Sequence, residues 1–236
     1  MIDIAILAVI AVVTWCVASD GPWGAAITFV SVILSGLLAM NLFEPVAQFM
    51  AVNVMNSYEW QHRWDVLALV GLFAAFVTLL RMLGETLMPT YAEVENLLYE
   101  FARWGFGFLT GYVVAAILLT ALHTAPLPRE FMGFVPERNN LFDFAAPDRQ
   151  WLGFTQYVSE KSLRRSTPMG TPVFDGPVFP RIPSDLSTNH VWASFPIKYA
   201  ARREQFTTGQ ASAGATSLPT APPPPSTPSG GAASGF

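Results

Sequence analysis

Four apolar stretches dominate the first half of the chain, at residues 2–18, 24–43, 66–88 and 101–122. A bilayer core of ~30 Å is crossed by about 20 mostly apolar residues in a helix, and each stretch comes close to that length. None of them has the polar face that a soluble helix turns to water. The pattern therefore predicts an all-α membrane protein, with four transmembrane helices in a compact bundle within residues 1–123.

Prolines set the expected ends of two of these helices, because proline removes a backbone donor and disfavours helix in the residue before it. Pro45 follows the second apolar stretch and Pro89 follows the third. The mixed segment between the two stretches carries Trp60 and Trp64, which is typical of the aromatic belt at a membrane boundary.

The chain beyond the fourth stretch has a different character. Residues 124–206 are rich in proline and polar groups and predict a soluble, largely irregular tail. Within it, Trp151, Phe154 and Val158 recur at helical spacing and indicate an amphipathic helix at 148–165. Such a helix would lie on lipid headgroups or pack on the rest of the tail, and the sequence leaves both placements open.

Two charged residues interrupt the third apolar stretch. Arg81 and Glu85 lie four residues apart, on one helical face, near the end of the stretch. An arginine at that place can extend to the headgroups, and the glutamate can pair with it. We interpret the two residues as membrane-interface charges, with an ion or proton relay as the alternative.

Small residues form stripes on two of the expected helices. In lipid, helices associate where small side chains let their backbones approach. We therefore expect helix packing along these stripes, and a hinge or a pore-lining helix is the alternative. The stripes are Ser31, Ser35 and Ala39 in the second stretch, and Gly107, Gly111 and Ala115 in the fourth.

Composition agrees with a membrane chain. Hydrophobic residues make up 52% of the 236 residues and charged residues only 13%, about half the share usual in soluble domains. The formal net charge of −4 is small and dispersed, so nucleic-acid binding is not expected. Cys16 is the single cysteine, which excludes an intrachain disulfide. Residues 207–236 carry no charged side chain and are predicted to be disordered.

Candidate chemistry is sparse. Glu59 and His62 form one Glu-x-x-His pair, half of a carboxylate–histidine metal site, without a second copy. His123 and His190 have no ligand-type neighbours at useful spacing. Phosphate-binding, dinucleotide-binding, zinc-protease and nucleophile-elbow motifs are absent from the sequence. We therefore expect no enzyme activity, no metal and no cofactor.

The order of these features resembles the colicin V production protein family of four-span bacterial inner-membrane proteins. The resemblance covers about residues 2–122 and rests on the opening "IDIAILAVIAVV" with Asp3, on "LFEP" after the second stretch, and on Gly107 and Gly111. It implies a membrane protein involved in producing or exporting a bacteriocin, and it implies no catalytic residue. The first turn, "SDGPWG", lacks the basic residues usual in the family, and the proline-rich tail extends beyond the family core.

Four spans place both termini on one side of the membrane. Basic residues favour the cytoplasmic side, and a cytoplasmic N-terminus puts Arg63, Arg129 and Arg138 there and only Arg103 outside. The family's usual basic first turn argues for the opposite orientation. We expect both termini in the cytoplasm.

Two functional hypotheses follow. The first is an accessory or scaffold protein whose membrane bundle and tail engage a protein partner in bacteriocin production or export. The second is a subunit of a small homo-oligomeric channel or transporter, with the Gly107–Ala115 face lining the pore and Arg81 and Glu85 at its mouth.

Overall fold

The computed structural model describes most of the first 162 residues: 2–54, 58–87, 96–128, 130–135 and 139–162, with the single positions Phe195, Tyr199 and Arg203. The predicted disordered segment 207–236 lies outside the described residues, as do Arg129 and Arg138. The side chains of Glu59 and His62 lie outside them too.

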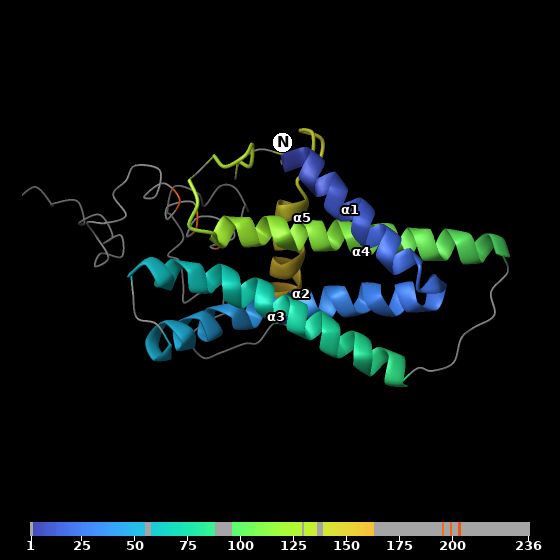
Figure 1. Cartoon of the computed structure of the whole chain (residues 1–236), viewed down its shortest axis with the longest axis horizontal. Helices are drawn as coiled ribbons and strands as arrows, with labels where there is room; N and C mark the ends of the chain where they lie inside the picture. The colour runs from blue at the N-terminus through green and yellow to red at the C-terminus, as the bar shows by residue number, and fades with distance from the viewer. Residues whose placement is uncertain are drawn as a thin grey trace, which may run out of the picture.

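The described chain is all-α, as the apolar pattern predicted. A short N-terminal helix and three long helices form a bundle, followed by a fifth helix that ends in a π-helical turn (Figure 1). The bounds are α1 Ile2–Ala18, α2 Gly21–Asn53, α3 Tyr58–Leu87, α4 Asn96–Thr124, α5 Pro147–Tyr157 and the π-helical turn Val158–Ser162.

Three of these helices are long and apolar enough to cross a membrane: α2, the part of α3 at Arg63–Leu87, and α4. Helix α1 is apolar as well but has only 17 residues. The apolar helices imply a lipid bilayer as their solvent, because each is too apolar around its circumference for water. The protein is therefore a multi-pass membrane protein.

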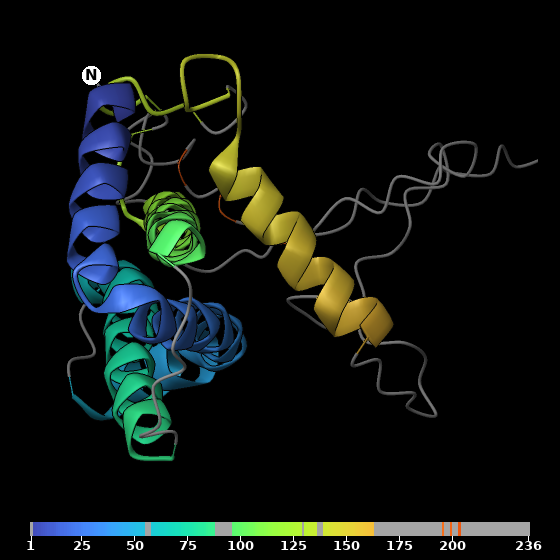
Figure 2. The ribbon, with the colours of Figure 1, turned by 90° about the vertical axis from the view of Figure 1, so that its right-hand side faces the viewer.

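Helix α4 occupies the centre of the bundle. Seen along α4, α1 lies on one side and α5 on the other, while α2 and α3 lie together beneath it (Figure 2). One apolar core joins α2, α3, α4 and α5, and a second joins α1 with the C-terminal half of α4. Helices α1 and α2 are consecutive in the chain, yet α1 packs mainly on α4.

Helix α2 extends beyond the end that Pro45 suggested and continues to Asn53. Proline inside a helix forfeits one backbone hydrogen bond. Phe43 and Ala47, on either side of Pro45, are buried in the core shared with α3. This burial offsets the lost hydrogen bond and keeps the helix continuous.

Helix α5 crosses α2 and α4 at a steep angle (Figure 1). Trp151 and Leu152 are buried in the core that α2, α3 and α4 share. The sequence left open whether this helix lies on headgroups or on the rest of the tail. In the structure its apolar face packs on the transmembrane helices themselves.

Candidate functional site

The glycines of α4 lie where α1 crosses it. A Cβ atom built on Gly111 would stand 2.7 Å from the backbone oxygen of Ile10, and one on Gly107 would stand 2.9 Å from that of Thr14. Ala115 is buried in the same α1–α4 core. Two backbones therefore meet here at a distance that leaves no room for side chains.

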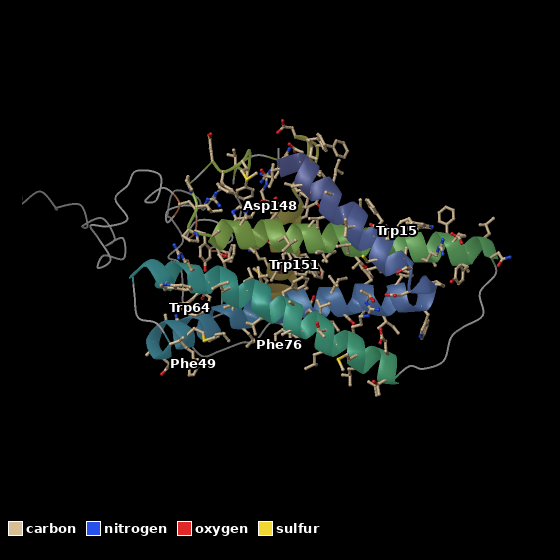
Figure 3. The ribbon with its side chains drawn as sticks, in the orientation of Figure 1. Trp15, Phe49, Trp64, Phe76, Asp148 and Trp151 are labelled. Atoms are coloured by element: carbon tan, nitrogen blue, oxygen red, sulfur yellow. The ribbon has the colours of Figure 1, made fainter. Side chains whose placement is uncertain are left out.

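The small residues of α2 face inward as well. Ser31, Ser35 and Ala39 are all buried. Beside them, Gly36 forms a notch that holds the ring of Trp151 from α5: a Cβ on Gly36 would lie 2.5 Å from the ring and 2.7 Å from Ile117 of α4. Figure 3 shows Trp151 between α4 and α2. Gly36 thus meets two neighbouring helices, α5 and α4.

Arg81 has two acidic partners instead of the one that helical spacing suggested. Its Nε donates to Glu85 Oε1 at 2.9 Å, and its Nη2 donates to Asp20 Oδ2 at 2.7 Å. Asp20 lies in the turn between α1 and α2, so the pair connects that turn to the last turns of α3. All three side chains are partly exposed, so the ion pairs contribute little to stability in water.

A buried polar pair joins α4 to α5, and sequence reasoning missed it. His123 Nε2 lies 2.8 Å from Asp148 Oδ2, and the two side chains are 3% and 0% exposed. His123 lies in the last turn of α4, and Asp148, labelled in Figure 3, lies in the first turn of α5. Asp148 Oδ1 has no hydrogen-bond partner among the described residues. A carboxylate buried without a partner costs free energy, so Asp148 is stable at this place only while it contacts His123. The pair therefore fixes the start of α5 against the end of α4.

Two further side chains close this junction. The ring of Phe134 packs edge-on against His123, with ring centroids 5.1 Å apart. The guanidinium group of Arg203 lies over the Phe134 ring, 4.9 Å from its centroid, and donates to the carbonyl oxygens of Leu122 and Pro128 at 2.5 and 2.6 Å. Leu122 lies in the last turn of α4, where a cation suits the helix dipole.

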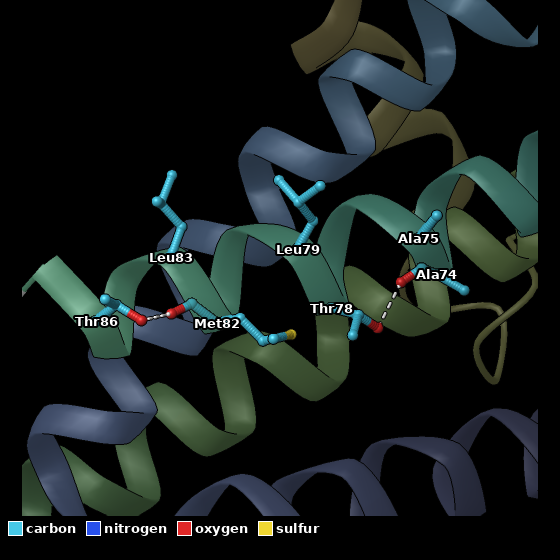
Figure 4. A pocket seen from close by; sticks show the side chains of 7 residues that line it. All are labelled: Ala74, Ala75, Thr78, Leu79, Met82, Leu83 and Thr86. Atoms are coloured by element: carbon cyan, nitrogen blue, oxygen red, sulfur yellow. Dashed lines mark hydrogen bonds between the residues drawn. The ribbon is translucent and has the colours of Figure 1, made fainter.

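Helix α3 carries an open apolar groove on its outer face. The groove measures about 730 Å³, and its lining comes from α3 alone (Figure 4). The hydroxyl groups of Thr78 and Thr86 donate to the carbonyl oxygens of Ala74 and Met82 on their own helix, so they require nothing polar from a ligand. The lining residues are Ala74, Ala75, Thr78, Leu79, Met82, Leu83 and Thr86.

Over the described parts of the chain, no group of three His, Cys, Asp or Glu side chains could hold a metal ion. The His123–Asp148 pair connects α4 to α5. The sequence did not indicate this pair, because His123 and Asp148 are 25 residues apart and meet only when the chain between them folds back.

The comparisons with known proteins agree with the fold. A family model described as "Colicin V production protein" matches residues 2–138, more than half of the chain. No curated protein and no solved structure matches. The matched region contains α1 to α4 and the first residues after α4, and it ends before α5.

Proposed function

Because the chain belongs to the colicin V production protein family, we propose that it is an accessory or scaffold protein in the production or export of a bacteriocin. In this role it is not an enzyme and needs no metal or cofactor. It acts in the inner membrane with both termini in the cytoplasm. This orientation places two exposed basic residues toward the cytoplasm, where basic residues are favoured. They are Arg63, near the start of α3, and Arg149 in α5.

The observation that supports a partner is the unequal burial of the long helices. In the apolar stretch of α3 only 17% of the residues are buried, against 44% in α2 and 50% in α4. A methyl group in place of the Gly71 hydrogen would have no atom within 4 Å, and Ala74 and Ala75 on the same helix are exposed. Small residues on an open helix face are where a second membrane helix approaches closely.

The partner we propose is an apolar transmembrane helix of the secretion system, lying along the groove of α3. The groove accepts such a helix because its two threonine hydroxyls are already paired within α3. Arg81, Glu85 and Asp20 form the polar end of this face, where the partner's helix leaves the lipid.

A homo-oligomeric channel or transporter is the second candidate, since a second copy could fill the same groove. The pore-lining version with Gly107 and Gly111 is less favoured, because α1 covers that face of α4. A channel of this kind would therefore be lined by α3.

Secretion of an active bacteriocin tests the proposal. In a producing strain that lacks the chromosomal copy, we expect the wild-type chain to restore secretion. We expect Ala75→Trp, which fills the groove, to lower secretion about tenfold, the effect of about 1.4 kcal/mol of lost binding. Ala8→Trp is the matched control, because Ala8 is an exposed alanine on α1.

Equal secretion by both variants, at equal amounts in the membrane, would contradict a role for the α3 face. Failure of the wild-type chain to affect secretion at all would contradict the proposed function.

A further inference from the structure

Two tight turns follow α4 and precede α5. In the first, Phe131 and Phe134 form an isolated antiparallel bridge, and in the second Leu141 and Ala145 do the same. The turns are joined by a hydrogen bond of 3.2 Å from the backbone nitrogen of Val135 to the side-chain oxygen of Asn140. They therefore form one small unit of described chain.

The inner side of this unit is packed on the bundle. Phe134 is fully buried in the core between α1 and α4, and Leu141 packs against the same core. Asn140 is buried between the two turns. The unit thus packs against one end of α1 and α4.

Hydrogen bonds fix the unit to the first turn of α1. The backbone nitrogen of Ile2 donates to the carbonyl oxygen of Met132 at 3.2 Å. The backbone nitrogen of Phe142 donates to Asp3 Oδ1 at 2.7 Å. Both turns therefore lie at the level where α1 begins.

The outer side of the unit is apolar and exposed. Met132 is 62% exposed, Phe142 is 57% exposed and Phe144 is 92% exposed. Met132 and Phe142 also have positive φ angles, 52° and 51°, a backbone conformation that large side chains rarely adopt. In water this arrangement would leave three large hydrophobic side chains unburied, two of them on a backbone conformation that their size disfavours.

The length of α1 places these side chains relative to the bilayer. Its 17 residues span about 25 Å at 1.5 Å each, less than the ~30 Å of a hydrocarbon core. A helix that is too short for the core has its ends drawn to the boundary of the hydrocarbon. Met132 and Phe142, whose backbones are hydrogen-bonded to Ile2 and Asp3, then lie at that boundary and not in bulk water.

We propose that the turns at 130–135 and 139–146 form a lipid-binding surface. On it, Met132, Phe142 and Phe144 insert into the boundary between headgroups and acyl chains, in the leaflet where α1 begins. The ligand is the bilayer itself. The stretch 129–149 has three basic and four acidic side chains and so carries no net positive charge, and insertion does not depend on anionic lipid. This inference is independent of the role in bacteriocin production.

Nitroxide labels test the inference in the full chain reconstituted into phosphatidylcholine vesicles. In a Cys16→Ser background, the labelled positions are Met132→Cys, Phe142→Cys and Phe144→Cys. Glu130→Cys, exposed in the same turn, is the water-facing reference, and Leu109→Cys, exposed in the middle of α4, is the lipid-facing reference. Oxygen partitions into lipid, whereas a nickel chelate stays in water, so the ratio of the two accessibilities reports depth.

We expect the oxygen-to-nickel ratio at the three positions to exceed that at Glu130 several-fold and to stay below that at Leu109, because the turns lie at the boundary of the hydrocarbon and Leu109 lies deeper. Adding phosphatidylglycerol should leave the ratio unchanged. Nickel accessibility equal to that at Glu130 would place the turns in water and overturn the inference. Loss of access to both reagents would mean that protein covers the turns, and that result would overturn it too.

Discussion

Helices α1 and α4 approach closely because Gly107 and Gly111 have only a hydrogen atom as a side chain. The Cβ of an alanine at Gly111 would stand 2.7 Å from a backbone oxygen of α1, and a backbone cannot rotate away as a flexible side chain can. Gly105 lies six residues earlier on the same helix, and a Cβ placed on it would have no atom within 4 Å. The two positions therefore separate packing from helix propensity.

We expect Gly111→Ala to lower the free energy of unfolding by about 1 to 2 kcal/mol, since overpacking costs about 1–3 kcal/mol and alanine regains up to about 1 kcal/mol of helix propensity. Gly105→Ala should be neutral or stabilising by up to about 1 kcal/mol. Reversible unfolding in mixed detergent micelles, followed by circular dichroism, measures both. The same effect at both positions would show that α1 does not pack where the structure places it.

The buried pair at the end of α4 calls for a double-mutant comparison. His123→Leu leaves the carboxyl group of Asp148 buried without its partner, and removing one member of a buried pair costs about 3–5 kcal/mol. Replacing both residues by leucine removes the unpaired group. We therefore expect the double variant His123→Leu/Asp148→Leu to have a larger free energy of unfolding than His123→Leu alone, in the same micelle experiment. Additive losses would mean that the two side chains do not interact.

Sequence reasoning reached some of these residues and not others, for a physical reason. Gly107 and Gly111 repeat at the spacing of one helical face, so the sequence displays them together. Asp20 and His123 are single residues whose partners, Arg81 and Asp148, come from other elements. Only the folded chain brings them together.

At the scale of elements, the apolar stretches predicted the number and order of the bundle helices. Their ends were predicted less well, because apolar content marks the part of a helix in lipid and not its whole length. Helix α4 begins at Asn96 and α2 ends at Asn53, each beyond its apolar stretch. The placement of α5 on α2 and α4 depends on the notch at Gly36, which has no signature in the sequence.

The notch gives a prediction for α5 as a unit. A methyl group on Gly36 would meet the ring of Trp151 at 2.5 Å, so Gly36→Ala should push α5 away from α2 and α4. We expect amide hydrogen exchange in α5 to become about tenfold faster, which corresponds to about 1.4 kcal/mol of lost local stability. Gly153→Ala is the control, because Gly153 lies on α5 with no atom near its built Cβ. Unchanged exchange in Gly36→Ala would argue that α5 does not use this notch.

At the scale of the whole molecule, the helices divide into a covered group and an uncovered face. Helix α4 is surrounded by α1, α2 and α5, whereas α3 turns most of its apolar stretch outward. We propose that a protein helix covers α3 in the cell.

The mass of the intact complex tests that claim most directly, by native mass spectrometry after gentle extraction from the producing membrane. We predict a defined complex with a different protein, which Ala75→Trp weakens and Ala8→Trp preserves. A closed complex of this chain alone would favour the channel candidate instead. A bare monomer for the wild-type chain would contradict the claim that α3 is a binding face.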